Sequence, residues 1–125
     1  MTVAQGRPST PEELFRDSPA GMDLYRAAHR LITTTVAASV RSTRSQVAFR
    51  RRRGFAYVWN PRRHLKTDVP AVLSIALPRR IDSPRFKEIA HPSTNVWMHH
   101  LELRTAAELD AEVAGWVREA YEAAA

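Results

Sequence analysis

The sequence contains no cysteine among its 125 residues. This absence excludes disulfide bridges, thiolate metal sites and cysteine nucleophiles. The sequence also lacks any run of about 18 apolar residues, the length that a membrane-spanning helix requires. Its opening residues, MTVAQGRPSTPEEL, have no apolar core of the kind found in secretory signals. We therefore expect a soluble, cytoplasmic protein that does not interact with membranes.

The usual sequence motifs of enzyme active sites are missing as well. There is no H-E-x-x-H, G-x-S-x-G, P-loop or G-x-G-x-x-G pattern. The adjacent His99 and His100 would point to opposite faces of a strand, so the two side chains cannot hold one metal ion together. We expect no metal and no cofactor, and the sequence identifies no catalytic residue.

What is present is the composition of a folded protein. Hydrophobic residues make up 44% of the chain and charged residues 26%, which is close to the averages for globular proteins. A chain of this length can bury one hydrophobic core. We expect a flexible N-terminal tail over residues 1–9 and a single α+β domain over residues 10–125.

Helices are predicted towards both ends of the chain. Thr10 is placed as an N-cap before Pro11, and Glu13 is placed to complete a capping box. After a turn, apolar residues recur at helical spacing over residues 22–38. A second capping-box pattern over residues 105–108 predicts the start of a final helix. The order of elements is therefore two helices, a set of strands, and one helix.

Five short segments between the helices are predicted to be strands, because they are rich in β-branched and aromatic residues and are bounded by turn-forming residues. They are residues 41–50, 55–60, 71–77, 85–91 and 97–104. The simplest arrangement is a five-stranded antiparallel meander. The two N-terminal helices and the C-terminal helix would then pack on one face of this sheet.

Charge is unevenly distributed along the chain, whose formal net charge is +6. Residues 41–87 contain 13 Lys or Arg and two acidic residues, a net charge of +11. Residues 101–125 carry a net charge of −4. A strongly basic segment attracts polyanions such as nucleic acid, so the predicted sheet is the expected binding region.

The stretch FRRRRGFAYVW, residues 49–59, is predicted to be a β-hairpin. A type I turn that ends in a left-handed Gly54 would pair Arg51 with Phe55 and Phe49 with Tyr57. This register places five apolar residues on one inward face, namely Val47, Phe49, Phe55, Tyr57 and Trp59. The alternative is that these aromatic rings stay exposed and stack on the bases of a single-stranded nucleic acid.

A meander also brings two distant basic turns to the same edge of the sheet. The arginines expected there are Arg50, Arg51, Arg52, Arg53, Arg79, Arg80 and Arg85. Guanidinium groups donate paired hydrogen bonds to phosphate oxygens. We therefore predict a non-enzymatic binding module for an anionic partner, nucleic acid, with this arginine-rich edge as its site. In the alternative interpretation, these arginines only keep the protein soluble.

The last predicted strand holds the residues most suggestive of chemistry. His99 shares a face with apolar neighbours, which is typical of a hydrogen-bonded core or interface histidine. His100 and Glu102 share the other face and could form an acid/base pair, which would make the protein a small enzyme. An ordinary surface pair is the simpler interpretation. A further alternative is a module for protein–protein interaction or homodimerisation.

Several separated segments together resemble a known protein family. They are SQVAFRRRRGFAYVW, VLSIALPRR, DSPRFKE, MHHLELRTAAELDAEV and WVREAYEAA. In this order they are similar to the domain of unknown function 5655 family of small uncharacterised bacterial, mainly actinobacterial, proteins, over residues 23–123. The resemblance implies an intracellular α+β domain and supplies no catalytic residues.

Overall fold

Two helices begin the described part of the chain, which comprises residues 9–125 of a computed structural model. Helix α1 (Pro11–Leu14) is a single turn, and helix α2 (Pro19–Thr35) runs for 17 residues. The capping box predicted at Thr10 and Glu13 is confirmed, since Thr10 Oγ1 accepts a hydrogen bond from Glu13 N–H at 3.1 Å and Glu13 Oε1 accepts one from Thr10 N–H at 2.9 Å. Except for Ser9, the predicted tail lies outside the described residues.

The α+β class and the antiparallel sheet are confirmed, but the sheet has six strands where five are predicted. The strands are β1 (Ser39–Ser42), β2 (Val47–Arg50), β3 (Gly54–Trp59), β4 (Ala71–Leu77), β5 (Glu88–Ser93) and β6 (Val96–Leu103). The extra strand arises because Thr43 closes a turn inside the segment predicted as one strand. Its backbone N–H donates to the Gln46 carbonyl at 2.8 Å, and its hydroxyl accepts from the Gln46 N–H at 3.3 Å.

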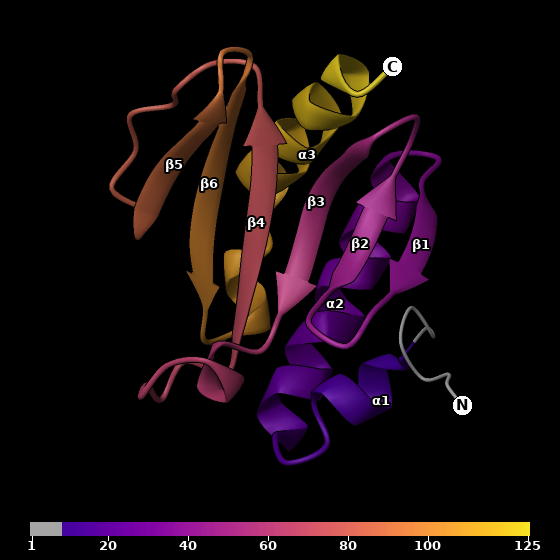
Figure 1. The fold of residues 1–125 in the computed structure, drawn as a ribbon, viewed down its shortest axis with the longest axis vertical. Coiled ribbons are helices and arrows are strands. Elements are labelled where there is room, and N and C mark those ends of the chain that lie inside the picture. Colours follow the sequence, from indigo (N-terminus) through magenta and orange to yellow (C-terminus); the bar gives the residue numbers. More distant parts are fainter. Residues whose placement is uncertain (1–8) are drawn as a thin grey trace, which may run out of the picture.

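The order of strands in the sheet is β1-β2-β3-β4-β6-β5, as Figure 1 shows. The predicted meander is therefore wrong at its end, because β6 lies between β4 and β5. Leu101 and Leu103 of β6 are buried, whereas β5 exposes most of its residues. A polar strand tolerates the edge of a sheet better than an apolar one does. This difference accounts for the position of β6 inside the sheet and of β5 at its edge.

The final helix, α3 (Ala111–Ala123), begins later than predicted. The capping box at Thr105 and Glu108 is present, but it caps a 3-10 turn, η2 (Ala106–Glu108). Asp110 then caps α3 by accepting a hydrogen bond from the Val113 N–H at 3.2 Å. None of the helices within residues 9–125 is both long enough and apolar enough to cross a membrane.

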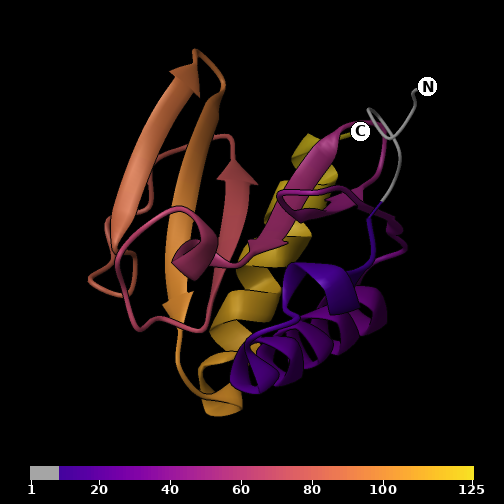
Figure 2. The ribbon, with the colours of Figure 1, turned by 60° about the horizontal axis from the view of Figure 1, so that its bottom comes forward.

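Helices α2 and α3 lie behind the sheet in Figure 1 and on the same side of it in Figure 2. The buried core lies between them and the sheet, and it includes Ala28 and Ile32 of α2, Leu73 and Ile75 of β4, and Val117 of α3. Within residues 9–125, no α-helix covers the other face of the sheet. We call this uncovered side the open face.

A β-bulge in the β2–β3 hairpin decides which side chains reach the open face. β2 pairs Phe49 with Ala56, and the register then shifts so that Arg50 pairs with Gly54. Phe55 and Ala56 consequently both enter the helix-covered core. The predicted pairing of Phe49 with Tyr57 is wrong by one residue.

The shift moves two aromatic residues to the other side of the sheet. Tyr57 and Trp59 lie on the open face, beside Ser74 of β4. The inward face predicted for the hairpin therefore contains Val47, Phe49 and Phe55 but excludes these two rings. Aromatic side chains on an uncovered sheet are available to a ligand.

Gly54 is required for a different reason from the one predicted. It is the first residue of β3 and does not adopt a left-handed conformation. A Cβ atom at this position would lie 2.8 Å from Cζ of Tyr57. Glycine therefore allows the Tyr57 ring to lie directly over the start of its own strand.

Candidate functional site

The predicted arginine-rich edge is largely occupied by contacts with α3. Arg79 forms two hydrogen bonds with the Glu119 carboxylate, of 2.8 and 3.0 Å. Arg51 and Arg53 donate to the carbonyls of Tyr121 and Ala123 in the last turn of the helix. Cations are favoured there, since the C-terminal end of a helix carries partial negative charge.

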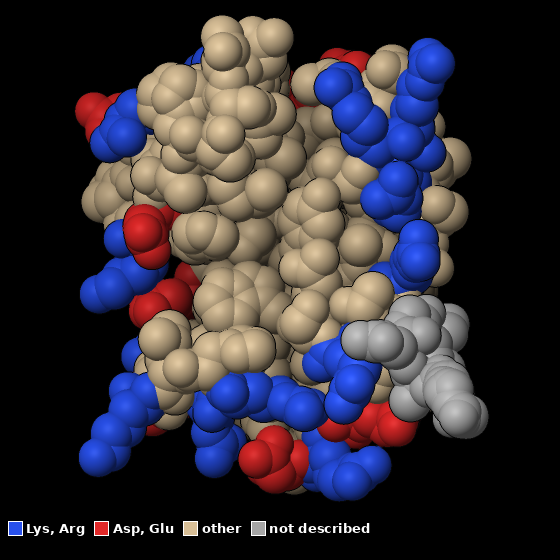
Figure 3. All heavy atoms as spheres, in the orientation of Figure 1, with Lys and Arg blue, Asp and Glu red and all other residues tan. Residues whose placement is uncertain are grey.

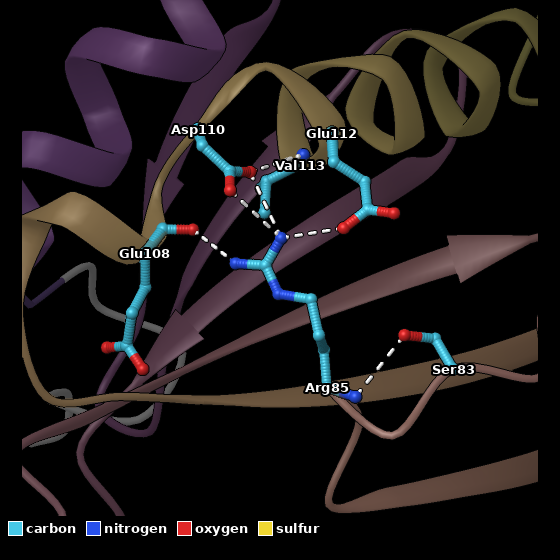
Figure 4. Close-up of polar contacts among 6 residues, drawn as sticks. All are labelled: Ser83, Arg85, Glu108, Asp110, Glu112 and Val113. Carbon is cyan, nitrogen blue, oxygen red and sulfur yellow. Dashed lines mark hydrogen bonds and ion pairs between the residues drawn. The ribbon is translucent and has the colours of Figure 1, made fainter.

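Arg85 is held most completely, as Figure 4 shows. One terminal nitrogen, Nη1, donates to the Asp110 carboxylate at 3.1 Å and to the Glu112 carboxylate at 2.8 Å, and the other, Nη2, donates to the Glu108 carbonyl at 2.7 Å. Hydrogen bonds with these two carboxylates raise the pKa of Arg85 above its ordinary value. Arg85 thus anchors the β4–β5 connection to the start of α3.

Three of the seven predicted arginines have no side-chain hydrogen bond or ion pair within residues 9–125, namely Arg50, Arg52 and Arg80. Arg50 lies on the open face, because it is two residues after Ala48 on the same strand, and Ala48 pairs with Tyr57 on that face. Arg41 of β1 lies on this face too, since it pairs with Ala48 from the other side. Arg41 and Arg50 therefore place positive charge on the open face of β1 and β2.

A groove runs along β4 on the open face, and the sizes of the side chains explain it. The outward residues of β4 are small: Val72, Ser74 and Ala76. The neighbouring strands carry large residues opposite them, namely Tyr57 and Trp59 on β3 and Met98, His100 and Glu102 on β6. Small side chains between two rows of large ones leave a channel.

Two hollows lie along this channel, and a third opens beyond its upper end. The middle hollow, of about 410 Å³, is lined by Gln46, Tyr57, Trp59, His64, Ser74, Met98 and His100, among others. A lower hollow of about 190 Å³ shares Trp59 and His100 with it. The third hollow, of about 420 Å³, shares Tyr57 and Met98 with the middle one but reaches round the end of the sheet to Ala120, Ala123 and Ala124 at the end of α3. Figure 3 shows the hollowed strip, with Lys and Arg along its right and lower margins.

A chain of hydrogen bonds fixes the centre of the groove. Trp59 Nε1–H donates to Ser74 Oγ at 2.9 Å, and Ser74 Oγ lies 2.6 Å from His100 Nδ1. The indole can only donate, so Ser74 Oγ accepts from Trp59 and can donate its own hydroxyl hydrogen to Nδ1. Burial lowers the pKa of His100 and so favours the neutral ring. In the tautomer that accepts from Ser74, Nε2 carries the proton and presents an N–H donor to the groove.

The predicted acid/base pair is not formed as a pair. His100 and Glu102 share a face of β6, but within residues 9–125 no hydrogen bond joins them, and the partner of His100 is Ser74. Over the same residues, no three His, Asp or Glu side chains are grouped so that they could hold a metal ion. The arrangement suits the binding of a ligand by stacking and hydrogen bonding.

The core role predicted for His99 is confirmed. Its side chain is fully buried. Nε2 accepts a hydrogen bond from the Ile81 N–H at 3.0 Å, and Nδ1 lies 2.8 Å from the Trp97 carbonyl, to which it donates. His99 therefore holds the β4–β5 connection against the sheet and takes no part in the open face.

A profile of the family described as Domain of unknown function (DUF5655) matches residues 12–124. The chain belongs to this family. The match confirms the resemblance predicted from the separated segments, and it covers every strand and helix except the first residue of α1. No curated protein and no solved structure matches this DUF5655 chain.

The sequence did not single out Ser74 of this DUF5655 chain. The signal was present, because Ser74 is the only polar residue in the strand AVLSIAL and lies at an outward position of the alternating pattern. The role of Ser74 still depends on Trp59, whose position follows from the bulge. Pattern alone therefore could have marked the residue but not its partners.

The free energy of unfolding of this DUF5655 chain is expected to fall between pH 7.5 and pH 5.5. Burial lowers the pKa of both His99 and His100. The unfolded chain, whose histidines titrate near pH 6.5, therefore binds more protons than the folded chain in this range, and acid favours unfolding. Urea unfolding at the two pH values measures the difference.

A His100→Gln variant provides the control for this pH dependence. This variant should still lose part of its free energy of unfolding at pH 5.5, because burial lowers the pKa of His99 in the folded chain. Equal stability of the wild-type chain at both pH values, or greater stability at pH 5.5, would contradict the prediction.

Proposed function

We propose that this protein binds single-stranded nucleic acid along the groove of its open face. The observation that carries the proposal is the position of Tyr57 and Trp59, two partly exposed aromatic residues on an uncovered sheet. Aromatic rings on such a surface stack on bases of any sequence, with about 1–3 kcal/mol per base. The binding surface therefore differs from the arginine edge predicted from the sequence.

The distribution of charge across the sheet supports a nucleic acid as the ligand. One row of paired residues runs from Arg41 through Ala48, Tyr57, Ser74 and His100 to Glu88. With strands about 4.8 Å apart, its ends are separated by about 24 Å. A nucleotide has the matching asymmetry, because its phosphate is anionic and its base carries N–H donors. The phosphates would follow β1 and β2, and the bases would point towards β5 and β6.

The width of the groove favours a single strand. The side chains that line its two sides come from β3 and β6. The backbones of these strands are two strand spacings apart, or about 10 Å. This space admits the bases of one extended strand, whose phosphates would lie outside it over β1 and β2, and it is too narrow for a double helix. Proteins that bind single strands on a sheet combine the same elements, namely a basic path for the backbone and aromatic platforms for the bases.

Fluorescence anisotropy with labelled heptamers of RNA and DNA tests this proposal. The wild-type chain should bind both single strands more tightly than a duplex of the same sequence. An Arg41→Gln/Arg50→Gln variant should bind more weakly, and the slope of log affinity against log salt should fall by about 1.4, or 0.7 for each lost phosphate contact.

The matched control is Arg79→Gln, since Arg79 is already paired with Glu119 away from the groove. It should bind as the wild type does. The proposal would be overturned by equal affinity for duplex and single strand, or by an Arg41→Gln/Arg50→Gln variant that binds as well as the wild type.

A further inference from the structure

The lower hollow of the groove combines apolar walls with hydrogen-bonding groups. Trp59, Val72 and Leu65 contribute apolar surface, and His100, Glu88 and Glu102 contribute polar groups. Leu65 is 60% exposed, the most exposed large hydrophobic residue within residues 9–125. Burial of the Leu65 side chain against a flat ligand in the hollow would remove apolar surface from water and so favour binding.

The polar groups of this hollow have a defined hydrogen-bonding character. In the neutral tautomer that accepts the Ser74 hydroxyl hydrogen at Nδ1, His100 is a donor through Nε2–H. Glu88 and Glu102 lie on neighbouring strands, and their side chains form no hydrogen bond or ion pair with other residues in the range 9–125. Their carboxylates are therefore free acceptors, and Lys87 at the same hollow offsets part of their charge.

Resting on the proposed function, we infer that the lower hollow binds one base of the bound strand and selects guanine. Among the four bases, guanine alone presents two adjacent N–H donors, at N1 and N2, next to a carbonyl acceptor, O6. A carboxylate can accept both N–H groups in parallel. The Glu102 carboxylate would accept from N1–H and N2–H, and His100 Nε2–H would donate to O6.

The other bases satisfy fewer of these groups. Adenine has no carbonyl and no hydrogen on its ring nitrogen N1, so its N6 amino group could satisfy one carboxylate oxygen and would leave the other without a donor. Uracil and thymine offer one N–H between two carbonyls, and one of those carbonyls would face a carboxylate. Leaving such groups unpaired is the main source of discrimination at a hydrogen-bonding site.

The test uses labelled heptamers of uridine in which the central base is guanine, adenine, cytosine or hypoxanthine. Affinity for the guanine heptamer should exceed that for the adenine heptamer by about tenfold. The hypoxanthine heptamer should lose most of this advantage, because hypoxanthine is guanine without the N2 amino group. A Glu102→Gln variant should bind all four heptamers with similar affinity.

Glu122→Gln is the matched control, since it makes the same chemical change on an exposed position of α3. It should keep the preference for guanine, and urea unfolding should show that both variants fold. Guanosine monophosphate, titrated while the Leu65 methyl signals are followed by NMR, tests the hollow without the rest of the strand. Adenosine monophosphate should cause smaller shifts at the same concentration.

Two different failures can be distinguished. If all heptamers bind equally and the Arg41→Gln/Arg50→Gln variant still weakens them, the proposed function stands and the selection of guanine is overturned. If no heptamer binds and guanosine monophosphate leaves the Leu65 signals unchanged, both proposals are overturned. Loss of the guanine preference in Glu122→Gln would likewise contradict a role for the lower hollow.

Discussion

Replacement of Phe49 by alanine is expected to lower the free energy of unfolding by about 3–5 kcal/mol, the usual cost of removing a buried phenylalanine ring. Phe49 is fully buried, and its ring centroid lies 5.9 Å from that of His29 on α2. The lost contacts therefore include those that join α2 to the sheet. Urea unfolding followed by circular dichroism measures the change.

Val40→Ala is a closely matched control. Val40 is the pairing partner of Phe49 on β1 and faces the same side of the sheet, but it is 40% exposed. Its replacement should cost less than about 1 kcal/mol. Similar losses in the two variants would show that the core does not extend to this part of β2.

Replacement of Trp59 by alanine is expected to reduce the affinity for single-stranded heptamers by tenfold or more. The substitution removes a stacking platform, which is worth about 1–3 kcal/mol per base. It also removes the hydrogen bond from the indole to Ser74, which lies 2.6 Å from His100 Nδ1. Fluorescence anisotropy gives the affinity.

Two further variants separate these contributions. Trp59→Phe keeps an aromatic face but loses the indole N–H and part of the stacking area, so its affinity should lie between those of the wild type and Trp59→Ala. Trp97→Ala removes a tryptophan that is stacked on His91 and faces away from the groove. A loss of affinity in Trp97→Ala as large as that in Trp59→Ala would contradict a specific role for the groove.

Local signals in the sequence were sufficient for much of the fold. The capping box at Thr10 and Glu13 marked the start of α1. The second one, at Thr105 and Glu108, caps the 3-10 turn η2 rather than the start of α3. Periodicity located α2 and most of the strands. These features depend on residues close together in the chain, so the pattern predicts them well.

The features that the sequence did not predict depend on contacts between distant residues. The bulge beside Arg50 shifts the register by one, and this turns Tyr57 and Trp59 to the open face. Arg79 and Arg85 pair with acidic residues of α3 that follow them by 25–40 positions. A charge count along the chain recorded both signs but could not show that they neutralise each other.

The position of β6 between β4 and β5 also affects the order in which the sheet folds. The β5–β6 hairpin is local, whereas β4 and β6 pair residues between 20 and 32 positions apart, from Leu77 with Trp97 to Ala71 with Leu103. Closing such a segment costs more chain entropy than forming a hairpin. We expect the two halves of the sheet to form separately and to join at the β4–β6 seam in the rate-limiting step. The groove lies over that seam, so it exists only once folding is complete.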